Sequence, residues 1–109
     1  MAKKSAKAVE APILENSVDA FKQAFTDHIH HTLARNNVTV TDHEKFLAVA
    51  YAVRDRLIDR WIKTQETYYE KDVKRVYYLS LEFLIGRTLG NSVLNLHVES
   101  AVAEALDAL

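Results

Sequence analysis

The sequence predicts part of an α/β protein, mostly α-helical in these residues, with one strand of a parallel sheet. Apolar residues recur at three- and four-residue steps over long stretches, which predicts helices. Only two glycines and one proline occur among 109 residues, which also favours long helices over turn-rich β structure. The segment "RVYYLSLEF" (75–83) is rich in β-branched and aromatic residues, with apolar side chains on both parities. That pattern is typical of a strand covered on both faces.

The composition is that of an ordinary globular protein, with 49% hydrophobic residues, 27% charged residues and a formal net charge of −1. The charge balance therefore gives no sign of a nucleic-acid partner. No run is long and apolar enough to span a bilayer, and the basic start "MAKKSAKAVEAP" lacks the apolar region of a secretory signal. The chain has no cysteine, which is compatible with a reducing compartment. We expect a cytoplasmic protein with no nucleic-acid or membrane partner.

Residues 1–15 are predicted to form a mobile N-terminal tail, because they lack periodicity and are rich in lysine and alanine. Ser5 lies among lysines, as a site for a basophilic kinase would, but the simpler interpretation is a solvated serine. The rest of the chain, residues 16–109, is predicted to be one incomplete domain.

The first helix is predicted to begin near Asn16 or Ser17, either of which can cap it, with Asp19 in its first turn. Its apolar face consists of Val18, Phe21, Phe25, Ile29 and Leu33. The sequence "RNN" (35–37) ends the pattern, because asparagine tolerates the left-handed conformation of a helix exit.

The second helix is predicted to follow a short connector, and Thr41 and Glu44 fit a capping box at its start. An apolar stripe then continues from Phe46 to Tyr68, which corresponds to a helix of about 28 residues and roughly 40 Å. The stripe is broad, so we expect it to be buried against more than one neighbour.

A third helix is predicted from around residues 87–91 to Leu109, where the sequence shows neither a capping glycine nor a polar exit. The strand at 75–83 needs hydrogen-bonding partners that must come from outside these residues or from another chain. Both observations indicate a piece of a larger protein.

A histidine cluster near the end of the first helix, "DHIHH" (27–31), raises the question of a metal site. His28 and His31 are one turn apart, but helical zinc sites usually use an i, i+4 pair with an identifiable third ligand. We therefore expect packed or solvated histidines and no metal.

Aromatic residues near the end of the second helix could bind a planar ligand. Tyr68 and Tyr69 lie one to two turns after Trp61 and Gln65, and such side chains can stack on a nucleotide base. The spacing alone favours the alternative, aromatic residues of the core.

Glu82, Gly86 and Arg87 form the most suggestive group, because ligands of open α/β folds bind beyond the carboxyl ends of strands. Gly86 permits a tight turn, and Arg87 could pair with Glu82 or hold an anion at the next helix N-terminus. A strand-end ion pair that only orients the turn explains the pattern equally well.

The string "VRDRLIDRWIKTQETYYEKDVKRVYYLSLEFLIGRTLGNSVLNL" (53–96) resembles the N-terminal region of the α-1,4-glucan phosphorylases, the glycogen, starch and maltodextrin phosphorylase family. "DHIHHTLARNN" (27–37) is similar to the family's first helix, so the resemblance covers roughly residues 16–109. It implies the start of the N-terminal lobe of a GT-B enzyme, which has two Rossmann-like lobes.

The resemblance also implies an activity. Family members transfer a terminal glucosyl unit of an α-1,4-glucan to inorganic phosphate and release α-D-glucose 1-phosphate. Their cofactor, pyridoxal 5'-phosphate, is bound to a lysine of the C-terminal lobe, which lies beyond Leu109. We therefore expect an enzyme when the protein is complete and no activity from these 109 residues alone. The alternative is a non-catalytic helical interaction module derived from the same region.

By the same resemblance, Glu82, Gly86 and Arg87 lie at the edge of the substrate cleft and organise it, with no catalytic residue in this chain. Tyr69 and Gln65 match the AMP site of the animal enzymes. Two departures from the animal enzymes predict that this site is vestigial.

Asn36 replaces an aspartate of the animal connector, and Glu66 replaces a glutamine beside the phosphate-bearing ligand. The family also implies a homodimer through the first two helices and their connector, residues 35–41. The preferred glucan is not predictable from these residues.

Overall fold

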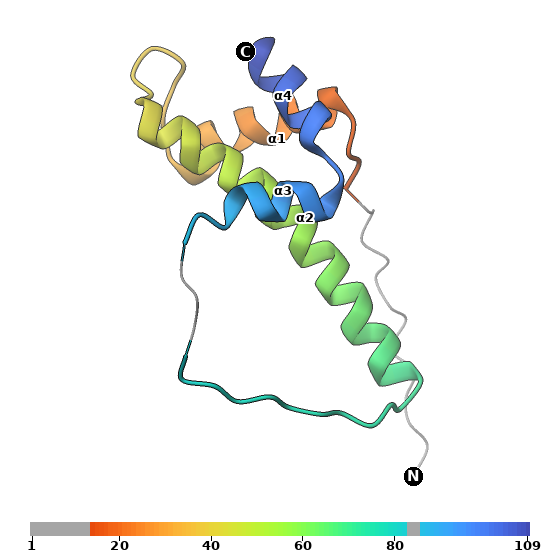
Figure 1. Cartoon of the computed structure of the whole chain (residues 1–109). Helices are drawn as coiled ribbons and strands as arrows, with labels where there is room; N and C mark the ends of the chain where they lie inside the picture. Colours follow the sequence, from red (N-terminus) through yellow and green to blue (C-terminus); the bar gives the residue numbers. More distant parts are fainter. Residues whose placement is uncertain (1–13, 83–85) are drawn as a thin grey trace.

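The computed structural model describes residues 14–82 and 86–109. Their regular structure is helical: α1 (Val18–Asp27), η1 (His28–Thr32), α2 (Asp42–Glu70), α3 (Leu89–Leu96) and α4 (Glu99–Asp107). Figure 1 shows α2 as a long rod: α1, α3 and α4 gather around one half, and the other half projects away from them. The prediction of a mostly helical fragment is confirmed. Among the described residues, no helix has the length and apolar character needed to cross a membrane.

The start of α1 is as predicted. Ser17 is the N-cap, and its hydroxyl accepts the Ala20 N–H at 3.3 Å. The helix then widens into the π-helical turn η1, in which the Leu33 N–H donates to the His28 carbonyl at 2.9 Å. The left-handed residue at the exit is Ala34, with φ 53°, so the prediction that an asparagine takes this conformation is wrong.

The start of α2 also agrees with the sequence. Thr41 is the N-cap, its hydroxyl accepts the Glu44 N–H at 3.3 Å, and the Glu44 carboxylate accepts the Thr41 N–H at 2.9 Å. This reciprocal pair satisfies two backbone donors that a helix start otherwise leaves free.

The predicted third helix is two helices, which corrects the sequence prediction. His97 separates α3 from α4 with φ 57° and ψ 47°, the left-handed conformation. The His97 N–H donates to Leu94 O at 3.0 Å and the Val98 N–H donates to Val93 O at 3.3 Å, as in a Schellman motif. Val98, the residue directly after the break, is buried in the core.

The predicted strand is not present in the described residues, which is a second correction. Residues 73–79 have no regular structure, and Phe83, the last residue of the predicted strand, lies outside the described residues. A strand exists through hydrogen bonds to a neighbouring strand, and the described residues offer none. Figure 1 shows the segment as a drawn-out loop away from the helices. Its large side chains are exposed: Val76, Tyr77, Tyr78, Leu79 and Leu81.

The core lies where α1, α3 and α4 meet α2. Its buried side chains are Phe21, Ala52, Val53, Leu96, Val98 and Ala105. Small residues on α2 let the neighbouring helices approach closely. No residue of α2 beyond Arg56 is buried in this chain.

Candidate functional site

The group predicted at the strand end does not form a closed site in this chain. Glu82, Gly86 and Arg87 are all exposed, and residues 83–85 between them lie outside the described residues. The Glu82 N–H donates to the Ser80 hydroxyl at 3.1 Å, a local turn contact. Among the described ion pairs, none joins Glu82 to Arg87. Among the described residues, no atom lies within 4 Å of the place that a Cβ at Gly86 would take.

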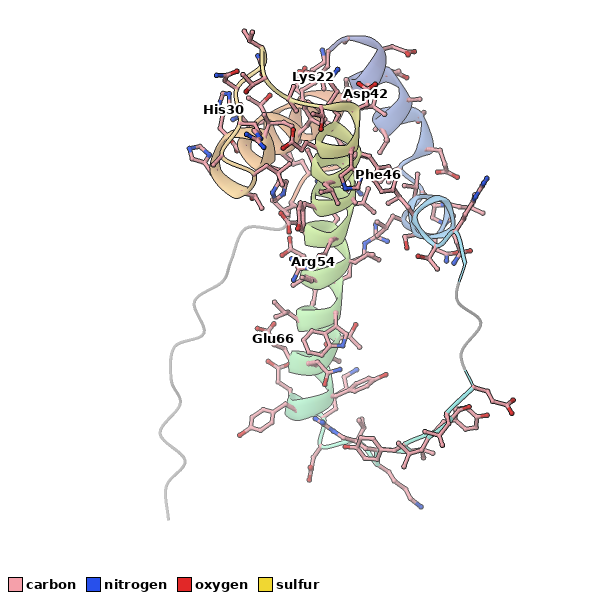
Figure 2. The ribbon with its side chains drawn as sticks, turned by 90° about the vertical axis from the view of Figure 1, so that its left-hand side faces the viewer. Lys22, His30, Asp42, Phe46, Arg54 and Glu66 are labelled. Atoms are coloured by element: carbon pink, nitrogen blue, oxygen red, sulfur yellow. The ribbon has the colours of Figure 1, made fainter. Side chains whose placement is uncertain are left out.

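The predicted nucleotide group lies on the projecting half of α2. Gln65 and Tyr69 are one turn apart on this helix and share a face, with Tyr69 71% exposed. Trp61 is 63% exposed, so these aromatic residues are not core residues of this chain. Figure 2 shows Glu66 on the same half, away from the other helices, whereas Asp42 and Phe46 lie at the opposite end of α2.

The histidine cluster joins two helices. The His28 ring bonds to Asp55 Oδ2 at 2.9 Å through Nε2 and to Thr32 Oγ1 at 2.8 Å through Nδ1. The ring also lies against Tyr51, with 5.5 Å between ring centroids. These contacts tie η1 to α2. Among the described residues, no group of three or more potential metal ligands lies close together.

Arg56 is a buried cation that the sequence pattern did not single out. Its Nη1 donates to Ala52 O at 2.8 Å and its Nη2 to Glu15 O at 2.8 Å. The guanidinium stacks on Phe21, 3.6 Å from the ring centroid. Burial lowers the pKa of Arg56, while the Asp55 and Asp59 carboxylates oppose this shift.

The same part of α2 fixes the chain ahead of α1. Asp59 Oδ2 accepts the Leu14 N–H at 3.1 Å, next to the bond from Arg56 to Glu15. Leu14 and Glu15 are the last residues of the predicted tail, and the rest of that tail lies outside the described residues. One sequence signal points to Arg56: it lies three residues after Val53 and therefore on the same side of the helix.

Several hydrogen bonds hold the connector between the first two helices, residues 35–41. Asn36 Oδ1 accepts the backbone N–H groups of Val38 and Thr39 at 3.0 and 2.9 Å. Arg35 pairs with Glu44. Hydrogen bonds from the Thr41 backbone and from Arg35 lower the pKa of the Glu44 carboxyl from 4.5 to about 2.

The comparisons with known proteins identify relatives of this chain. It is 52% identical over 89 residues to the muscle form of glycogen phosphorylase from Ovis aries. It is 49% identical over 89 residues to the muscle form from Homo sapiens and 48% identical over 85 residues to the brain form from Bos taurus. No protein-family model matches the chain.

The alignments to the muscle forms cover 82% of this chain and 11% of each relative, so the chain spans about a tenth of their length. The level and extent of identity confirm the resemblance to phosphorylases drawn from the sequence. The identities compare whole sequences and do not test the role of any single residue. The roles of Glu82, Gly86, Arg87, Gln65 and Tyr69 therefore stay predictions.

Proposed function

We propose that this chain, a homologue of the glycogen phosphorylases over most of its length, is the N-terminal part of an enzyme that degrades glycogen or a related α-1,4-glucan. Identity of about half of 89 residues to named glycogen phosphorylases is the observation that supports it most strongly. The chain covers 11% of those relatives, so the activity belongs to a longer protein.

The proposed reaction is phosphorolysis of a terminal glucosyl unit. The glycosidic bond between C1 and the leaving 4-oxygen breaks, a bond from C1 to a phosphate oxygen forms, and the leaving oxygen takes a proton. The products are α-D-glucose 1-phosphate and a glucan shorter by one unit. The long chain is proposed to form a GT-B fold with the reaction between its two lobes.

In that protein, the segment 73–82 is proposed to pair as a strand with a sheet formed by residues outside this chain. Its apolar side chains are exposed here and its backbone has no ladder, as expected of a strand without its sheet. Glu82, Gly86 and Arg87 would then lie where the strand ends. There we propose that they organise the cleft: the two charged groups position polar groups of substrate and protein, with neither acting as nucleophile or general acid.

The proposed cofactor, pyridoxal 5'-phosphate, requires a lysine that forms a Schiff base within an enclosed site. Of the described lysines, Lys45, Lys63, Lys71 and Lys74 are exposed and Lys22 is half-buried, and none of the five lines the apolar hollow between α1, α2 and α4. These residues therefore do not fit the cofactor. We propose that it is bound by parts of the enzyme outside this chain.

The proposed enzyme is not activated by AMP. Tyr69 and Gln65 keep the surface on which a base could stack, but Glu66 adds a negative charge near them that disfavours a phosphate-bearing ligand. Titrating the complete enzyme with AMP tests this. We expect no change in phosphorolysis, and a several-fold increase would contradict the proposal.

The proposed enzyme is a homodimer in the cytoplasm, with α1, α2 and the connector at the subunit interface. Exposed side chains at the connector support this, including Val38 at 93% exposure. Sedimentation of the complete protein should show a dimer at micromolar concentration. A monomer would contradict this part of the proposal.

The decisive experiment is an assay of the complete protein for glucose 1-phosphate release from glycogen, starch and maltodextrin in phosphate buffer. The 109-residue chain is the control, for which we expect no activity. The shared core of α1, α2, α3 and α4 favours one alternative, a non-catalytic helical interaction module. A complete protein without phosphorolysis on any of the three glucans would support that alternative.

A further inference from the structure

A single carboxylate joins the two ends of the connector. Glu44 Oε1 accepts a hydrogen bond from Arg35 Nε, at the start of the connector. Glu44 Oε2 accepts the backbone N–H of Thr41 at 2.9 Å and its hydroxyl at 3.0 Å, at the end of the connector. The Glu44 side chain is only 15% exposed although the connector lies at the surface.

The interior of the connector is held by a second acceptor. Asn36 Oδ1 binds the N–H groups of Val38 and Thr39 and also accepts the Thr39 hydroxyl at 3.0 Å. The Asn36 carbonyl accepts the Val40 N–H at 3.1 Å. The Asn36 oxygens thus pair the backbone N–H groups of residues 38–40 within the loop, and the apolar side chain of Val38 is exposed.

We propose that Glu44 is a positioning residue that holds residues 35–41 in one shape before a second copy of the chain binds, and so sets the strength of subunit association without contacting the partner. This inference rests on the proposed homodimer. A loop that must become ordered on binding loses affinity, whereas a loop already held in its bound shape does not. The low pKa of Glu44 agrees with a carboxylate held by several donors.

The test uses the complete protein with two variants at this position and one control. Glu44→Ala removes both contacts, whereas Glu44→Gln keeps an acceptor for Thr41 and loses the charged pair with Arg35. His43→Ala is the matched control, because His43 is exposed on the same turn and has no hydrogen bond or ion pair among the described residues.

Two quantities are measured for each variant: the dimer dissociation constant by sedimentation, and the amide hydrogen exchange of Val38 and Thr39 in the dilute monomer. We expect Glu44→Ala to raise the dissociation constant about 5- to 30-fold, on the scale of a lost helix cap, and to speed the exchange. Glu44→Gln should have a smaller effect in the same direction, and His43→Ala should match the parent protein.

The outcomes separate this inference from the proposed dimer. Faster exchange with an unchanged dissociation constant, or no change in exchange, overturns the role of Glu44 and leaves the dimer standing. A parent protein that is monomeric at every concentration overturns the dimer, and the inference about association with it.

Discussion

The two halves of α2 continue one apolar stripe but have different surroundings. Its buried residues are Ala48, Ala52, Val53 and Arg56, all in the half that contacts α1, η1 and α3. From Leu57 onwards, apolar side chains such as Trp61 and Ile62 are exposed. Figure 1 shows this second half extending beyond the other helices. The first half is covered by other helices of this chain along Ala48, Ala52, Val53 and Arg56, although Phe46 near its start is 54% exposed, whereas no residue of the second half is buried.

This difference shows what an apolar stripe reports. The stripe predicts that one face of the helix is buried, but it does not predict which residues cover that face. The second half of α2 and the segment 73–82 share the same property, a row of large exposed apolar side chains. Both agree with the proposal that residues outside this chain, which spans about a tenth of its relatives' length, cover these faces.

The largest expected effect comes from truncating Phe21 of α1, which packs on the first half of α2, and the comparison is Trp61 in the second half. Phe21→Ala should cost about 3–5 kcal/mol, because Phe21 is buried in the core and supports Arg56. Trp61→Ala in the exposed half should change stability by only about 0.5 kcal/mol in the 109-residue chain. Urea unfolding followed by circular dichroism measures both. Equal effects would contradict the division of α2 into a covered and an uncovered half.

The second effect concerns the buried cation at the boundary between the halves. Arg56→Met keeps a side chain of similar length but leaves the Glu15 carbonyl without its side-chain donor, at a cost of about 1–3 kcal/mol; the Ala52 carbonyl loses only a second bond, because it still accepts the backbone N–H of residue 56 within α2. Arg54→Met is the matched control, because Arg54 is exposed on the same helix and should have little effect. A similar loss of stability in both variants would indicate a general effect of charge removal.

Helix lengths and caps were predictable where their signals are local. Ser17, Thr41 and Glu44 act through hydrogen bonds to neighbours within four residues, so the starts of α1 and α2 follow from sequence. The break at His97 was missed because histidine, although enriched at positive φ among the non-glycine residues, is a much weaker signal for a helix end than glycine. The burial of Val98 in the core outweighs the cost of the left-handed conformation at His97. This is a tertiary effect, which a short stretch of sequence does not predict.

The strand prediction failed for a different reason. Its residues do have the composition of a covered strand, but a strand requires a partner, and the described residues supply none. The candidate site depends on that strand, so Glu82 and Arg87 are exposed here. Arg56 was missed because an arginine within "RDRLIDR" (54–60) suggests a solvated face.

A third, smaller effect tests the cost of the left-handed backbone conformation at His97, between α3 and α4. His97→Gly should raise stability by about 0.5–1 kcal/mol, because glycine adopts the left-handed conformation without a steric cost. Ala103→Gly in the exposed face of α4 should lower stability by about 1 kcal/mol, because glycine weakens a helix interior. Thermal unfolding of both variants gives the two signs. Destabilisation by His97→Gly would show that the histidine side chain itself supports the turn.

A fourth prediction concerns the pH dependence that the Glu44 carboxylate causes. Its pKa is lowered from 4.5 to about 2 in the folded chain, so the stability that it contributes is present above pH 4.5 and is lost as the pH falls through about 2. Following the Glu44 carboxyl by NMR should give a midpoint near 2, and Glu44→Gln should remove this step. A midpoint near 4.5 would show that the contacts with Thr41 and Arg35 do not persist in solution.

The most direct test of the central claim compares solvent access in the 109-residue chain and in the complete protein. Hydroxyl-radical labelling of Trp61, Tyr77 and Leu79 reports on the second half of α2 and on the segment 73–82, with Phe21 as the buried reference. We predict strong labelling of the first three residues in the chain alone and protection of all of them in the complete protein. Equal labelling of these residues in the two proteins would contradict the claim that the rest of a phosphorylase-like enzyme covers them.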